Sequence, residues 1–148
     1  MDKSFNSIEE LMAYVKKDMA NTIVKNSDEI EDIMLDKIQK NVYDAYTPRT
    51  YDRRYDDGGL YDRENIQVAA MPTGDGVDIS ITNNTIANGW DKGEYLDSII
   101  ELGAALDGDD YVPDYAKPRP FIEPTEEEIT EKNVIQKILK ENLNYIKW

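Results

Sequence analysis

With 148 residues, the chain is long enough for one compact domain that buries roughly two thirds of its unfolded surface. Its 31 acidic and 17 basic residues give a net charge of −14, which opposes affinity for nucleic acid over the chain as a whole. The absence of histidine and cysteine removes the commonest general base, a cysteine nucleophile, disulfides and the usual zinc ligands. No apolar run approaches the ~18 residues of a membrane span, and no signal-peptide core begins the chain. We therefore expect a protein made in the cytoplasm, without catalytic, cofactor or metal sites and without membrane contact.

Periodic apolar residues predict a helical region over residues 1–46. Ser7 and Glu10 have the spacing of a capping box. The stripe that follows consists of Ile8, Leu11, Met12, Val15, Met19 and Ile23. The periodicity continues with Ile30, Ile33, Met34, Ile38 and Val42. Asn26-Ser27 is the only break signal, so the region is either two helices or one kinked helix, and Thr47-Pro48 ends it.

Residues 47–63 interleave arginine with tyrosine, the two residue types that are enriched at the centres of protein interfaces. The same pattern can bind single-stranded nucleic acid. However, five nearby aspartates offset the basic charge and favour contact with protein; an ordinary solvated loop also fits. The candidate interface residues in and beside this segment are Tyr46, Arg49, Tyr51, Arg53, Arg54 and Tyr55.

Residues 64–103 have β character at first and helical character at the end. Val77–Thr82 alternates apolar with polar residues, Ile66–Ala70 precedes it, and Pro72–Gly76 supplies a turn, which predicts an antiparallel hairpin. Asn83–Thr85 has the form of a glycosylation sequon and is interpreted as a polar turn. Tyr95–Leu102 is expected to form a short helix or a strand–helix junction that ends at Gly103.

Residues 104–124 are expected to form a loop followed by a stiff arm. Residues 104–117 show no periodicity and are rich in aspartate, which predicts a loop that is mobile or ordered by a partner. Pro118 and Pro120 make the following segment extended. Apolar side chains in such irregular segments must either fold onto the core or be buried by neighbours. The candidate interface residues here are Tyr111, Tyr115, Arg119, Phe121 and Ile122.

Residues 125–148 are predicted to form the C-terminal helix. Thr125 and Glu128 have capping-box spacing, and Glu126–Glu128 would meet the positive end of the helix dipole in the first turn. All segments together predict a single α+β domain, with an N-terminal helical region, a central antiparallel hairpin and a C-terminal helix packed on the sheet.

Two short motifs bracket residues 42–125. Val42–Pro48 has the form Val-Tyr-x-x-Tyr-x-Pro and is followed by the tyrosine- and arginine-rich segment and by Gly59-Leu60. Arg119–Glu123 has the form Arg-Pro-Phe-aliphatic-Glu and precedes an acidic helix. In this order the motifs resemble the small head-to-tail joining, or tail-completion, proteins of long-tailed bacteriophages. Neither motif is catalytic.

The resemblance implies a structural, non-enzymatic virion protein: a subunit of a homo-oligomeric ring in the neck that joins the DNA-filled head to the tail. We expect a sixfold ring, to match tail symmetry, with a head-completion or connector protein on one side and a tail-terminator or tail-tube protein on the other. DNA would pass without specific binding through a lumen lined by acids, with 107–114 and 126–128 as candidates. The alternatives are a tail-terminator or head-closure ring protein and, in another class, a small soluble phage-encoded enzyme, an inhibitor or an acidic DNA mimic.

Overall fold

The computed structural model describes residues 3–48, 52–87, 93–103 and 116–145. In chain order its elements are α1 (Ile8–Lys25), α2 (Asp28–Lys37), the π-helical turn η1 (Ile38–Tyr43), the 3₁₀ turn η2 (Arg63–Asn65), β1 (Ile66–Pro72), β2 (Val77–Asn83), α3 (Leu96–Leu102), α4 (Ile122–Glu131) and α5 (Val134–Asn142). N-terminal helices, a central antiparallel hairpin and C-terminal helices confirm the α+β class.

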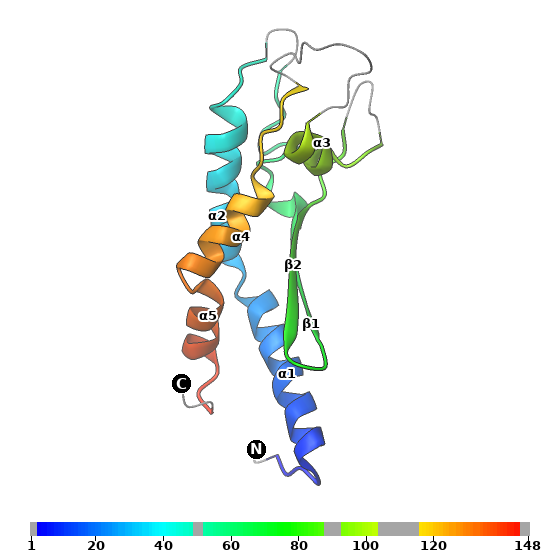
Figure 1. Ribbon diagram of the computed structural model, residues 1–148, viewed down its shortest axis with the longest axis vertical. Coiled ribbons are helices and arrows are strands. Elements are labelled where there is room, and N and C mark those ends of the chain that lie inside the picture. The colour runs from blue at the N-terminus through cyan, green and yellow to red at the C-terminus, as the bar shows by residue number, and fades with distance from the viewer. Residues whose placement is uncertain (1–2, 49–51, 88–92, 104–115, 146–148) are drawn as a thin grey trace.

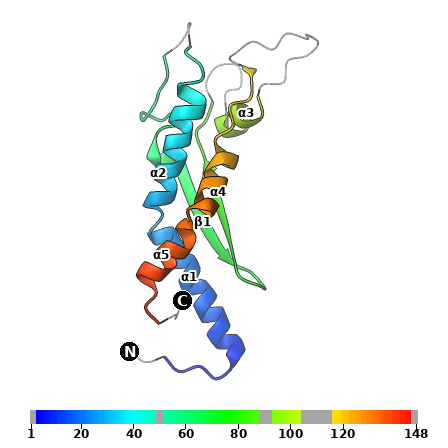
Figure 2. The same cartoon turned by 60° about the vertical axis from the view of Figure 1, so that its left-hand side comes forward.

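The molecule is elongated, and α1 and α2 follow one another along its long axis (Figure 1). The hairpin lies against α1, whereas α4 packs on α2 and α5 packs on α1 (Figure 2). The C-terminal helices therefore pack mainly on the N-terminal helices, and not on the sheet as the sequence suggested. α3 lies at one end of the molecule, and the start of α1 and the end of α5 lie toward the other (Figure 1). We call these the α3 end and the α1 end.

The break between α1 and α2 falls at Asn26 and Ser27, where the sequence placed it. The capping box at the start of α1 is confirmed, because the Glu10 amide donates to the Ser7 hydroxyl at 3.1 Å. Ser27, which precedes α2, does not cap this helix with its side chain. Its backbone is helical, and its hydroxyl donates to the Glu31 carboxylate at 2.8 Å.

The C-terminal region corrects two expectations. The helix begins at Ile122, so Thr125 lies inside α4, where its hydroxyl donates to the Phe121 carbonyl at 2.5 Å. The expected capping box is therefore wrong, and Glu126–Glu128 lie beyond the first turn. In addition, Asn133 adopts a left-handed backbone (φ 52°) that separates α4 from α5, so the region is two helices instead of one.

The core is one cluster of apolar side chains gathered from the helices and the hairpin. Its fully buried members include Ile23, Ile30, Met34, Ile38, Phe121 and Val134. One face of the hairpin contributes Val68 and Ile81, while Gln67 and Asp78 point to solvent. This alternation follows from the period of two in a strand, and it confirms the half-buried hairpin that the sequence predicted.

The hairpin pairs Ile66 with Asn83 at its base and Pro72 with Val77 at its tip. The tip is held to α1 because the Lys16 ammonium donates to the carbonyls of Thr73 and Gly74, at 2.8 and 2.9 Å.

Candidate interaction surface

Tyr43, the last residue of η1, is the centre of an aromatic cluster near the α3 end. Its ring meets the Tyr55 ring edge to face, with centroids 4.8 Å apart, and the Tyr61 ring lies 6.2 Å away. The Tyr43 hydroxyl accepts a hydrogen bond from the Tyr61 amide at 3.2 Å. Burial raises the pKa of Tyr43 above its ordinary value. The phenol therefore stays neutral and acts as a fixed part of the packing.

Arg53 caps the C-terminal end of the α2–η1 helical run. Its guanidinium donates to the Tyr43 carbonyl at 2.9 Å and also to the Tyr46 carbonyl. It stacks over the Tyr43 ring, 4.8 Å from the centroid. A cation at a helix C-terminus satisfies carbonyls that have no helical partner and complements the dipole. Arg53, predicted as an interface residue, is therefore used largely within the chain.

A tight turn follows, in which Tyr55 has a left-handed backbone (φ 50°) and Gly58 has φ 72°. A side chain on Gly59 would place its Cβ 2.5 Å from the Tyr55 carbonyl oxygen, so this close approach requires glycine. The turn leaves Tyr55 exposed while Leu60 enters the core.

A buried polar network holds this turn against the end of β2. The Asn83 amide donates to the Leu60 carbonyl at 2.8 Å, and the Thr85 hydroxyl contacts the Gly59 carbonyl at 3.1 Å. Both side chains are fully buried. Asn83 and Thr85 therefore do not belong to a solvent-exposed polar turn, because their side chains satisfy backbone groups in the interior, and only Asn84 between them is exposed.

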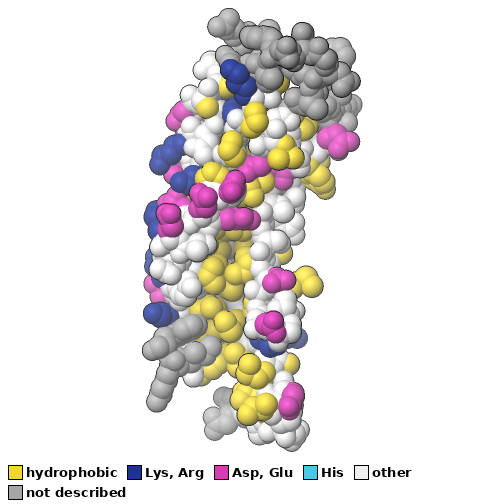
Figure 3. All heavy atoms as spheres, viewed as in Figure 1, with side chains coloured by type: hydrophobic (Ala, Val, Ile, Leu, Met, Phe, Trp, Pro, Cys, Tyr) yellow, Lys and Arg dark blue, Asp and Glu magenta, His cyan; other side chains and the backbone are white. Residues whose placement is uncertain are grey.

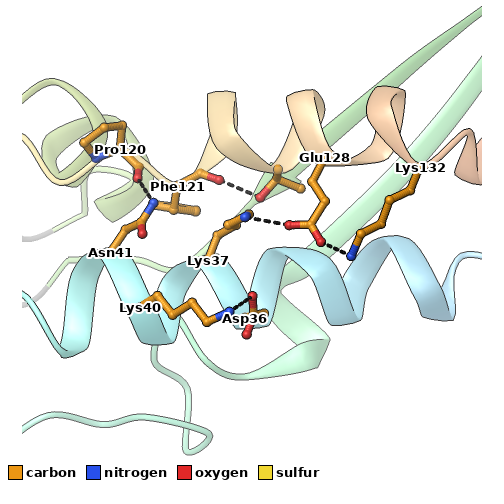
Figure 4. A network of polar contacts seen from close by, with 9 residues as sticks. Asp36, Lys37, Lys40, Asn41, Pro120, Phe121, Glu128 and Lys132 are labelled. Carbon is orange, nitrogen blue, oxygen red and sulfur yellow. Dashed lines mark hydrogen bonds and ion pairs between the residues drawn. The ribbon is translucent and has the colours of Figure 1, made fainter.

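The proline arm lies across the chain and does not project from it. The Arg119 amide donates to the Ile100 carbonyl of α3 at 2.8 Å, and the Asn41 side chain of η1 donates to the Pro120 carbonyl at 2.9 Å (Figure 4). The Arg119 guanidinium stacks over the Tyr46 ring, 5.1 Å from its centroid. Phe121 is 0% exposed, which confirms that it is buried and places it in the core of its own chain.

Glu101 of α3 caps the first turn of α4 from outside that helix. Its carboxylate accepts from the amides of Phe121, Ile122 and Glu123 at 2.8, 3.0 and 3.2 Å. These amides are among the helix-start donors that have no partner within the helix. This cap explains why α4 begins a turn earlier than the Thr125 pattern indicated.

α4 is also fastened to α2 by an ion-pair network. Glu128 contacts Lys37 of α2 at 2.5 Å and pairs with Lys132 one turn along α4 (Figure 4). The hydrogen bond to Lys132, followed by the one to Lys37, lowers the pKa of Glu128 to about 2. Hydrogen bonds and ion pairs thus connect the arm, α3, α4 and the end of the α2–η1 run.

Of the eleven predicted interface residues, four lie outside the described residues: Arg49, Tyr51, Tyr111 and Tyr115. Tyr55 is exposed, and Arg54 is half-buried, with its guanidinium donating to the Ile86 carbonyl at 2.7 Å. The other five make intramolecular contacts. These are Tyr46, Arg53, Arg119, Phe121 and Ile122, of which Arg119 and Phe121 are buried. In this conformation those two side chains are not exposed for a neighbouring subunit.

The exposed side of the cluster holds a shallow depression of about 360 Å³. It is lined by Gln39, Tyr43, Asp44, Thr47, Pro48, Asp52, Arg53 and Tyr55. Further exposed apolar side chains at the α3 end are Ile86 and Tyr95, which face each other across an isolated β-bridge, and Leu102 at the end of α3. We refer to these exposed side chains, together with Tyr55, as the α3-end group.

Sequence reasoning missed Tyr43, Glu101 and Asn83 as organising residues. Each acts on a partner at least 18 residues away in the chain, so no local spacing could identify it. Among the described residues, no group of three or more acidic side chains lies together as a metal site. None of the described helices combines the length and apolar character needed to cross a bilayer.

Comparison with known proteins identifies a family. Residues 7–145 match the protein family described as YomN. The chain belongs to the YomN family. This match covers α1 through α5 and so includes the arm, the Tyr43 cluster and the hairpin. No curated protein and no solved structure matches the chain.

Proposed function

We propose that the chain is a structural subunit of the neck of a tailed-phage particle, where it forms a ring that joins the DNA-filled head to the tail. In this role it acts by interface complementarity, without covalent chemistry. Its partners would be further copies of itself and the adjacent head-completion and tail proteins, and DNA would pass through the ring without specific binding.

The main support for the proposal is that two motifs far apart in the sequence contact one another in the structure. The Val42–Pro48 motif and the Arg119–Glu123 arm carry the resemblance to joining proteins, and they contact one another in the structure. Arg119 stacks on Tyr46, and the Asn41 side chain, next to the first motif, holds the Pro120 carbonyl. Two motifs that form one structural unit support a shared family signature better than two unrelated short matches would.

The α3-end group supports an assembly role. Leu102 is 77% exposed and Tyr95 is 55% exposed, at the same end as the Tyr43 cluster. Large apolar side chains gathered at one end of a protein are typical of a surface that a partner covers. In the proposed ring this end would contact a neighbouring subunit or an adjacent ring.

The test uses the phage or prophage that encodes the chain. Deleting its gene should give DNA-filled heads without tails, together with free tails, in electron micrographs of lysates. Normal tailed particles from the deletion would contradict the proposed function.

A complementing gene that carries Tyr95→Glu and Leu102→Glu tests the surface. Both positions are exposed, so folding should be preserved and joining should fail. Met71→Glu is the matched control, because the exposure of Met71 (69%) lies between those of Tyr95 and Leu102 but Met71 is near the hairpin tip. Full complementation by the double variant would show that the α3-end group does not mediate joining.

A further inference from the structure

The apolar stripe of α1 continues past the body of the protein. At its C-terminal end Ile23 is 1% exposed, and Met19 packs against the core. About two turns before Met19 on the same face, Met12 is 52% exposed, and about three turns before Met19, Ile8 is 71% exposed. Figure 3 shows hydrophobic side chains on this face between the C-terminal helices and the hairpin and onward to the α1 end. The stripe is thus half core and half open surface.

The described parts of the chain border this open stripe without covering it. The segment before α1 folds back over a different face, where the Phe5 ring lies 5.2 Å from the Tyr14 ring. On one flank, Lys16 holds the hairpin tip. On the other, the Tyr145 hydroxyl bonds the Asp18 carboxylate. Among the described residues, the stripe is therefore left open between two fixed edges.

The charged side chains beside the stripe would match those of a second copy of the same helix. Glu9 and Lys16 lie on the same edge of the stripe, because seven residues correspond to about two helical turns. If a second α1 lies antiparallel on the stripe, Glu9 of each copy comes beside Lys16 of the other. The Lys16 ammonium has three N–H donors, of which the hairpin tip uses two, so one is left for this ion pair. Ile8 then meets Val15, and Met12 lies near the twofold axis. A parallel arrangement would instead place Glu9 beside Glu9, which is repulsive.

We propose that the exposed α1 stripe is a homodimerisation surface, on which two copies of the chain pair their α1 helices antiparallel. An isologous contact of this kind closes with two copies and covers both stripes at once. A different partner would need an apolar helix with an acidic and a basic side chain at the spacing of Glu9 and Lys16. The α1 helix of a second copy already has both. The proposal concerns the isolated protein and does not rest on the proposed neck function.

The full chain tests it by analytical ultracentrifugation over a range of concentrations. We expect a species of twice the chain mass of 17.0 kDa. Ile8→Glu should raise the dimer dissociation constant about tenfold or more. This substitution places an acid in the first turn of α1, where the helix dipole favours it, so the monomer should stay folded. Val24→Glu, at a 42% exposed apolar position on a different face of α1, should leave the dimer unchanged.

Cysteine cross-linking tests the orientation, because the natural chain has no cysteine. Ile8→Cys mixed with Val15→Cys should form a mixed disulfide on mild oxidation. Each variant alone should link far less, since its cysteine lies roughly 10 Å along the helix from its counterpart. A monomer at every concentration, a dimer unaffected by Ile8→Glu, or preferential linking of Ile8→Cys to itself would each overturn the proposal.

Discussion

Phe121→Ala tests whether the proline arm is part of the core. Phe121 is 0% exposed and belongs to the same apolar cluster as Ile38 and Val134, so truncation removes a buried ring and leaves a cavity. Substitutions of this kind cost about 3–5 kcal/mol. Because a domain of this size has only about 5–15 kcal/mol of stability, the variant should lose a large part of it. The melting temperature should fall by roughly 6–20 °C.

Urea unfolding followed by circular dichroism measures the change in free energy of unfolding, and an unchanged slope would indicate the same unfolding transition. Phe5→Ala is the matched control, because Phe5 is the only other phenylalanine and is only partly buried, against the Tyr14 ring. It should cost about 0.5–1.5 kcal/mol. If Phe121→Ala cost no more than Phe5→Ala, the arm would not be docked as described.

Three further predictions concern the contacts around the arm and the turn. Glu101→Ala removes the external cap of α4 and should lower the free energy of unfolding by about 1–2 kcal/mol in urea titrations, whereas Glu94→Ala, at an exposed position outside this cap, should have little effect. The folded pKa of Glu128, about 2, lies below its usual 4.5, so its ion pairs stabilise the protein fully above the unfolded pKa and lose this effect as pH falls toward 2. The melting temperature of Glu128→Gln should therefore depend less on pH between about 2 and 4.5 than that of the natural protein. An unchanged dependence of the melting temperature on pH would contradict the ion-pair network. Gly59→Ala should cost about 1–3 kcal/mol because its Cβ would meet the Tyr55 backbone, and Gly74→Ala, which has open space, should not; equal melting temperatures for the two variants would refute the close approach.

Elements with strong local patterns could be predicted from the sequence. The alternation from Val77 to Thr82 identified the hairpin, because one face of a half-buried sheet must be apolar. The break at Asn26-Ser27 and the helix end at Gly103 were also marked by their residues. Phe121 was expected to be buried, since an apolar ring on a stiff arm needs a partner surface.

The rest depended on contacts between distant segments. The Thr125 and Glu128 spacing predicted the wrong helix start, because the donors of the first turn are satisfied by Glu101, 20 residues or more away in sequence. Arg53 belongs to a pattern typical of interfaces, but its guanidinium caps the end of the α2–η1 helical run. The sequence alone did not show that the chain folds back and brings Arg53 to this helix end. The separation of α4 from α5 follows from the left-handed backbone of Asn133, a conformation that asparagine adopts more readily than most residues but that its presence does not dictate.

The most direct test of the proposed neck function is a cryo-electron microscopy reconstruction of the head–tail junction in purified phage particles whose genome encodes this chain. The account predicts a closed ring of this fold between head and tail, with the α3-end group buried against protein and acidic side chains facing the DNA channel. A junction built without this chain, or a ring of it with a basic lumen, would contradict the account.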